Sequence, residues 1–264
     1  MRIKLFLPAF ALAICGMLTT HSAVSAQSQT TNTSGTEQTD VPVVSIDKLR
    51  QGQLKEGDLR TERGKKYSTP YVSKIEDNGI SGELLELPLS HAPYKKAFPT
   101  VESDAIAIGT VTGGEAFFSN DKTTIYSEFG LRIEEVFKAG DKSPLSRGQE
   151  ITAEREGGAV KYSNGKVLHL GKSGEPLPLA GGRYLLFLKW SEEGKDFLIL
   201  TGYKLENGKA YPLDGEGASI NSIFKNFLMY READERALLH KMNEEIVHPS
   251  PEEHRPGTFL LPKQ

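Results

Sequence analysis

The chain has 264 residues, with 32 lysines and arginines, 35 aspartates and glutamates, and a formal net charge of −3. This mildly acidic and well-mixed composition excludes a surface that binds a phosphate backbone, which needs clustered cations to release counterions, so nucleic acid is not expected as a partner. The length allows one sizeable core or two small ones, and we expect one.

The first 26 residues have the three regions of a cleavable secretory signal peptide. Arg2 and Lys4 precede an uncharged stretch over residues 5–18, and mostly small polar residues lead to Ala26. We expect cleavage between Ala26 and Gln27 and export to the periplasm or the medium. An uncleaved anchor is the alternative. The apolar stretch is shorter than the roughly 20 residues that span a bilayer, so no membrane span is expected after cleavage.

Cys15 is the single cysteine of the chain, and it lies inside this signal. Ile14 is too bulky for the position before a lipid-modified cysteine, which disfavours a lipoprotein site. The exported chain then has no cysteine, so it can form neither a disulfide nor a thiolate metal site. We expect its fold to depend on core packing alone.

Between the signal and residue 104 the sequence has little regular pattern. Residues 27–40 are almost all small or polar, which predicts a disordered linker. Residues 41–103 carry short apolar runs at 43–46 and 84–87 among many glycines and prolines. This segment is predicted to be an irregular extension that packs on the main domain.

Strand patterns begin directly after this extension. Residues 105–111 alternate small and β-branched side chains, and residues 123–138 have a period of two, with Ile125 and Phe129 on the same parity. The second pattern predicts a long, half-buried strand. The alternation fails at residues 134–137, which indicates a bulge or a sharp bend.

Further strands follow at short intervals and are separated by glycine turns, two of which are Asn-Gly pairs typical of tight hairpins. Residues 184–188 are almost continuously apolar, which predicts a strand buried on both faces. The fold class is therefore mainly β, with short antiparallel strands in a small barrel or sandwich. These later strands are predicted over residues 150–155, 159–162, 166–170, 183–190, 196–203 and 209–213.

After residue 222 the apolar spacing becomes helical. Leu238, Met242 and Ile246 lie four residues apart, and Pro249 ends the helix. The helix is expected to pack on one end or face of the β domain, which then covers residues 104–248. A partner-binding helix is the alternative. The proline-rich tail over residues 249–264 predicts an extended chain.

No catalytic, cofactor or metal motif in the sequence is complete. Residues 170–174 resemble part of a phosphate-binding loop, but Lys166 stands where that loop requires glycine. His248 and His254 lie in the proline-rich tail, which offers no scaffold for a metal geometry. No Gly-x-Ser-x-Gly sequence supplies a serine nucleophile. We therefore expect no catalytic residue, no cofactor and no bound metal.

Acidic and aromatic residues offer two further candidate sites. Glu134-Glu135 and the pair Glu154 and Glu156 are interpreted as surface charges opposite cationic neighbours. Several aromatic residues fall in predicted strands, where they could form a stacking or peptide-docking face, although aromatic residues are also ordinary strand formers. This candidate aromatic face comprises Tyr126, Tyr184, Trp190 and Tyr203.

Three segments carry a resemblance to known families: DAIAIGTV at residues 104–111, IEEVFK at 133–138 and GRYLLFL at 182–188. Over residues 104–213 the chain resembles a group of uncharacterised exported bacterial proteins. More distantly, it resembles the netrin-like domains that include the tissue inhibitors of metalloproteinases. The resemblance implies a small OB-like barrel with a C-terminal helix. Those inhibitors chelate their target's zinc through an N-terminal cysteine, which this chain lacks, so that mechanism is not carried over.

The function expected from the sequence is that of a non-catalytic binding or interaction module of the bacterial envelope. Its partner is expected to be a protein, a peptide or a glycan. Two alternatives stay open. The chain could inhibit a secreted protease through a loop or a strand edge, or it could be an enzyme whose acidic residues assemble only in the fold.

Overall fold

The computed structural model describes residues 41–49, 58–68, 74–76, 79–81, 95–142, 144–215 and 223–250. The predicted signal peptide with its cleavage site, the linker, the apolar run at 84–87 and the tail beyond residue 250 lie outside these ranges. Within the described ranges, no helix has both the length and the apolar character needed to cross a membrane.

Short elements precede the main sheet. They are β1 (Val43–Ser45), the 3-10 helix η1 (Ile46–Leu49), α1 (Leu59–Lys66), β2 (Lys74–Glu76) and β3 (Gly79–Ser81). The irregular extension predicted from the sequence therefore contains a helix that the sequence pattern did not predict. β1 pairs in parallel with β7, in a three-stranded sheet with the order β1-β7-β8.

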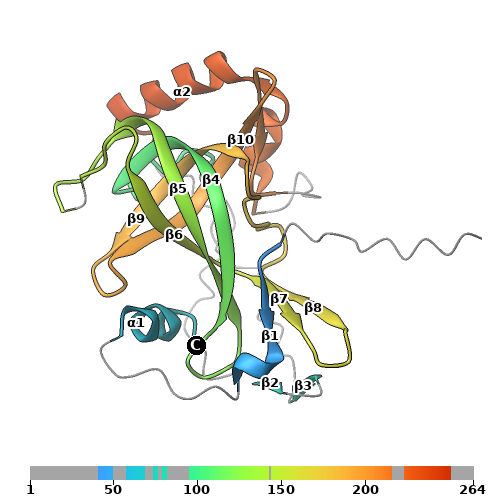
Figure 1. Cartoon of the computed structure of the whole chain (residues 1–264). Helices are drawn as coiled ribbons and strands as arrows, with labels where there is room; N and C mark the ends of the chain where they lie inside the picture. Colours follow the sequence, from blue (N-terminus) through green and yellow to red (C-terminus); the bar gives the residue numbers. More distant parts are fainter. Residues whose placement is uncertain are drawn as a thin grey trace, which may run out of the picture. The chain divides into compact units, whose positions relative to one another are not determined.

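The main domain is mainly β (Figure 1). Its strands are β4 (Ala105–Phe118), β5 (Ile125–Lys138), β6 (Glu150–Glu156), β7 (Gly158–Lys161), β8 (Val167–Leu170), β9 (Arg183–Ser191), β10 (Asp196–Glu206), β11 (Lys209–Pro212) and β12 (Ala233–Asp234). Two helices follow, the 3-10 helix η3 (Lys225–Tyr230) and α2 (Glu235–Val247). All the strands predicted after residue 104 are confirmed, with shifts of at most three residues at their ends, except that β4 runs seven residues beyond its predicted end at 111.

Seven of these strands form one sheet with the order β12-β11-β10-β6-β5-β4-β9. β9 also pairs with β10, so the sheet closes partly into a ring of β4, β5, β6, β10 and β9. The pairs in this ring are antiparallel except β6 with β10, which are parallel over a short stretch. Because β9 has neighbours on both sides and packed layers on both faces, it is the central strand that the sequence predicts.

The long strands β4 and β5 bend where the sequence predicts an irregularity. Their register shifts between Ile106 and Ala107 and again between Ile108 and Gly109, so that Phe137 and Glu134 of β5 have no direct partner. Bulges of this kind increase the local twist of a strand pair. They allow one long hairpin to contribute to a closing sheet.

The ring has one apolar core inside it and another on its outer side. Inside, one cluster includes Phe129, Leu131 and Leu186. Outside, Leu185 and other β9 side chains of the opposite parity form a second cluster with η3 and α2. α2 is capped by Asp234 and contributes buried Leu238 and Met242, and it crosses one end of the sheet in Figure 1. The predicted C-terminal helix and its packing against the β domain are thus confirmed.

Candidate functional site

α1 packs on the outward side of the ring, away from α2, and covers a set of acidic and aromatic side chains. The side chains come from four strands because alternate residues of a strand point to opposite faces. In β5, Phe129 points into the ring and Glu128 points outward, and in β6, Ala153 points in and Glu154 points out. We call this surface the acidic face. It comprises Phe117, Tyr126, Glu128, Glu154, Asp196 and Leu198.

α1 begins at an aspartate cap and closely approaches the turn between β4 and β5. The Asp58 carboxylate accepts a hydrogen bond from the Arg60 amide at 3.0 Å, an N-cap that satisfies an otherwise unpaired donor. The Asn120 side-chain amide donates to the Thr61 carbonyl at 2.9 Å. A Cβ at Gly64 would lie 2.2 Å from Asn120 Oδ1, so only glycine fits there in this arrangement.

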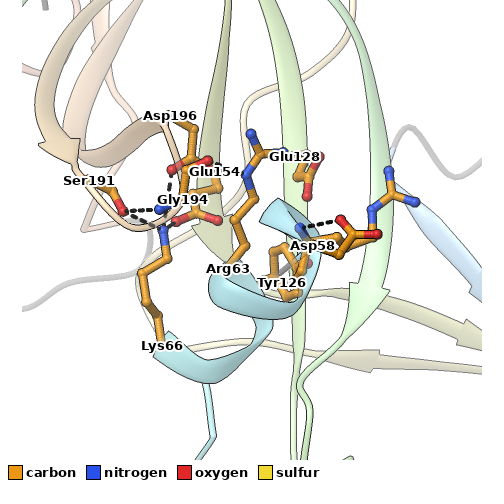
Figure 2. Close-up of polar contacts among 10 residues, drawn as sticks. Asp58, Arg63, Lys66, Tyr126, Glu128, Glu154, Ser191, Gly194 and Asp196 are labelled. Atoms are coloured by element: carbon orange, nitrogen blue, oxygen red, sulfur yellow. Dashed lines mark hydrogen bonds and ion pairs between the residues drawn. The ribbon is translucent and has the colours of Figure 1, made fainter. Parts of the chain in front are cut away.

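Lys66 inserts its ammonium group between two buried carboxylates (Figure 2). It forms an ion pair with Glu154 of β6, and it lies 3.3 Å from Asp196 Oδ1 at the start of β10. It also donates to the Ser191 hydroxyl at 3.0 Å. The side chains of Glu154 and Asp196 have no exposed surface. Lys66 therefore supplies the positive charge that these acids require in the protein interior.

Arg63 forms a second bridge one turn earlier in α1. Its Nε lies 2.7 Å from Asp196 Oδ2, and its Nη1 donates to Glu128 Oε2 at 2.9 Å. Nε also donates to the Gly194 carbonyl in the turn between β9 and β10, at 3.0 Å. Arg63 and Lys66 thus contact four strands, β5, β6, β9 and β10, and the turn between the last two.

Aromatic contacts flank the ion pairs. The Tyr67 ring stacks on Tyr126, with 4.9 Å between the centroids and an angle of 11° between the planes. The Arg60 guanidinium lies over the Phe117 ring at 3.9 Å, a cation–π contact. α1 therefore contacts the acidic face through cationic groups and one stacked ring rather than through an aliphatic stripe.

Burial changes the ionisation of the site. It raises the pKa of the Glu154 carboxyl to about 8, an effect that the nearby Asp196 charge reinforces and that Lys66 opposes. The Glu154 carboxyl therefore keeps its proton to a higher pH than an exposed glutamate does, while Lys66 and Arg63 pair with Asp196 and Glu128. Burial also raises the pKa of the phenols of Tyr67 and Tyr126 far above their ordinary range.

The arrangement of Ser191 and Lys66 has the composition of a serine–lysine pair but not the geometry of an activated nucleophile. The Ser191 hydroxyl oxygen accepts hydrogen bonds from Lys66 and from the Gly194 amide at 3.1 Å. A lysine that activates serine must accept the hydroxyl proton, whereas here the ammonium donates to it. Glu154 and Asp196 are covered by α1, so as arranged they contact no solvent and reach no substrate.

The structure places the four aromatic residues predicted as a binding face in three different clusters of the core. Tyr126 lies under α1, Tyr184 lies in the cluster inside the ring, and Tyr203 lies in the cluster under α2; all three are at most 2% exposed. Trp190 is partly buried against Phe197. The predicted common stacking face is therefore corrected, because both sides of the sheet are covered and the four rings share no surface.

The interpretation of the acids as surface charges holds for Glu134 and Glu156 but not for Glu154. Glu134 pairs with Arg183 at 2.9 Å, and Glu156 pairs with Lys172 at 2.7 Å, and all four side chains are partly exposed. Glu154 is fully buried beneath α1. Within the described residues, no group of three or more His, Cys, Asp or Glu is placed to hold a metal ion.

Sequence reasoning missed the residues that α1 contributes. One signal was present: Arg60, Arg63, Lys66 and Tyr67 are three or four residues apart, which places them on one helical face after the cap at Asp58. The partners of this face come from distant strands and could not be paired with it from the sequence.

In comparisons with known proteins, no protein-family model and no curated protein matches the chain.

Proposed function

We propose that this protein is an exported, non-catalytic binding module of the bacterial envelope that binds a peptide segment of a partner protein through the acidic face. The observation that carries this proposal is α1 itself. A polar segment from the N-terminal extension is held on this face by two cations, a stacked ring and a close approach at Gly64. The surface therefore already binds a peptide segment, within one chain.

The proposed fold is an OB-like barrel of the netrin-like kind. The ring of β4, β5, β6, β10 and β9 supports it, since an OB barrel is a five-stranded, partly open Greek-key barrel. In such barrels the face across the second and third strands and the adjoining loops binds ligands. Here β5 and β6 are the second and third strands of the ring, and α1 lies over their outward side chains.

Export to the periplasm or medium is proposed from residues 1–26, and intact mass tests it directly. The full chain is expressed in a bacterial host, and the product is purified from the periplasm and medium. A mass corresponding to a chain that begins at Gln27 is expected. A product that retains residues 1–26, or a lipid on Cys15, would contradict it.

The binding function is tested with the exported protein immobilised as bait, with Glu128→Ala as the matched control. Glu128 contacts Arg63 at the edge of the acidic face, so its removal changes the face with little change to the core. We expect an envelope protein captured by the wild type to bind saturably after purification, and at least about fivefold more weakly to the control. Absence of saturable binding by any envelope component would overturn the proposal. So would substrate turnover that is lost in Asp196→Asn.

A further inference from the structure

Resting on this proposed function, we infer that the partner segment is a basic helix that presents two cations three residues apart and a neighbouring aromatic ring, and that α1 is its internal competitor. The contacts of α1 indicate which chemical groups the acidic face binds. Arg63 and Lys66 form ion pairs with the carboxylates. Tyr67 stacks on the Tyr126 ring, and Arg60 makes a cation–π contact with the Phe117 ring.

The face has more acceptor capacity than α1 uses. Glu128 Oε1 is buried, and within the described residues it accepts no hydrogen bond. Buried polar oxygens are normally paired. A longer basic helix on the same face could supply a donor to this oxygen, and it would repeat the contacts of Arg63 and Lys66.

α1 is suited to be displaced. It has eight residues, and a helix of that length is marginal in water without tertiary contacts. Its own contacts are mainly ionic, and the apolar part of its docking is largely the Tyr67 ring. Its advantage is that it is tethered, which gives it a high effective concentration. A partner helix must overcome that advantage with additional contacts.

The negative charge of the acidic face determines which class of ligand can bind there. A face that presents Glu128 and Asp196, and Glu154 when it is ionised, repels phosphate groups, so a nucleic acid or a phosphorylated peptide does not fit it. An acidic peptide is excluded for the same reason. A basic helix from a partner protein complements the face, as α1 does.

The test uses a fluorescent peptide that copies residues 58–68 and a variant that releases α1 without changing the acidic face. Gly64→Leu places a side chain where even a Cβ would lie 2.2 Å from Asn120 Oδ1, so docking of α1 in its present position requires Asn120 to move and to lose its hydrogen bond to Thr61. We expect the peptide to bind this variant at least about tenfold more tightly than the wild type, whose own α1 occupies the face. A peptide with Arg63→Glu and Lys66→Glu should not bind.

A disulfide variant that locks α1 on the acidic face provides the opposite case, and it keeps the test valid even where Gly64→Leu does not fold. The exported chain is expected to lack cysteine, and a Cβ at residue 64 would lie 3.2 Å from Asn120 Cγ, so Gly64→Cys with Asn120→Cys brings two thiols within disulfide range. When oxidised, α1 is fixed on the face, and the peptide should not bind. When reduced, the variant lacks the Asn120 contact to Thr61 and should bind the peptide more tightly than the wild type.

Each other outcome overturns the inference. Equal binding of the charge-reversed peptide would mean that the carboxylates do not select the ligand. Equal binding by the oxidised and reduced variant would mean that the peptide binds elsewhere. Dimerisation of the reduced cysteine variant with loss of peptide binding would mean that a second copy's α1 is the occupant. If the peptide does not bind while an envelope protein still binds saturably, the inferred chemistry of the partner is wrong and the proposed function stands. If neither binds, the proposed function is wrong as well.

Discussion

Replacing Glu154 with glutamine should remove a pH dependence of stability that the buried carboxyl creates. Burial raises the pKa of Glu154 from 4.5 to about 8. Between these values the folded chain holds a proton that the unfolded chain releases, so the free energy of unfolding falls as the pH rises. The slope is about 1.4 kcal/mol per pH unit, and the loss over the window is on the order of 5 kcal/mol. Above the folded pKa this dependence ends.

Glu154→Gln keeps the size of the side chain and an oxygen for Lys66 but cannot titrate. We expect the variant and the wild type to be similar in stability near pH 5, and the variant to be more stable near pH 8.5. Other groups titrate in the same window, so the informative quantity is the difference between the two proteins at each pH. Glu156→Gln, on the same strand but partly exposed, is the matched control and should show no such trend.

Urea unfolding followed by Trp190 fluorescence measures these free energies. Trp190 is the single tryptophan, and its ring lies 5.1 Å from that of Phe197, so its emission reports on the core. A linear fit of the unfolding free energy against denaturant gives each value, provided that the transition is two-state. A difference between Glu154→Gln and the wild type that stays constant from pH 5 to pH 8.5 would refute the reasoning.

Three further substitutions test the ion pairs, the turn and the helix. Lys66→Met leaves Glu154 without its cation and Asp196 with Arg63 alone, and it should lower the unfolding free energy by about 3 kcal/mol in urea titrations, since breaking a buried ion pair is costly. Gly208 lies in the turn between β10 and β11 with a φ of 72°, so Gly208→Ala should lower the unfolding free energy by about 1 kcal/mol in the same assay. Gly113→Ala is the control, because a Cβ there meets open space and the backbone has no positive φ, and it should change the unfolding free energy by less than about 0.5 kcal/mol. Leu238→Ala removes a fully packed side chain from α2 and should cost roughly 2–5 kcal/mol, seen as a lower midpoint of thermal unfolding.

The strands of the main domain could be predicted from the sequence because their signals are local. The alternation around Phe129, its failure near Glu134 and the Asn207-Gly208 turn each depend on residues that are neighbours in the chain. The structure has β5, the bulges and the hairpin at these positions. Which strands pair to close the ring depends on contacts between distant segments, and the sequence pattern holds no information on those pairs.

The candidate site could not be predicted for the same reason, and the tyrosines show why. Alternation assigns Tyr126 to one side of β5, but it does not say what covers that side. A polar helix in a segment rich in glycine and proline covers it, and apolar periodicity does not detect such a helix. Tyr203 is likewise buried because η3 and α2 pack on another part of the ring's outer side.

The buried ion pairs beneath α1 favour a face that binds a specific segment over one that is only covered. Bringing Lys66, Glu154 and Asp196 out of water costs free energy that their mutual attraction does not reliably recover, and apolar side chains of similar size commonly stabilise a fold as well or better. A segment needed only to cover the sheet could therefore dock through leucines, as α2 does through Leu238. Ion pairs instead make docking depend on charged groups at matched positions. That is a property of a surface that distinguishes one segment from another, which is what a face shared between α1 and a partner helix requires.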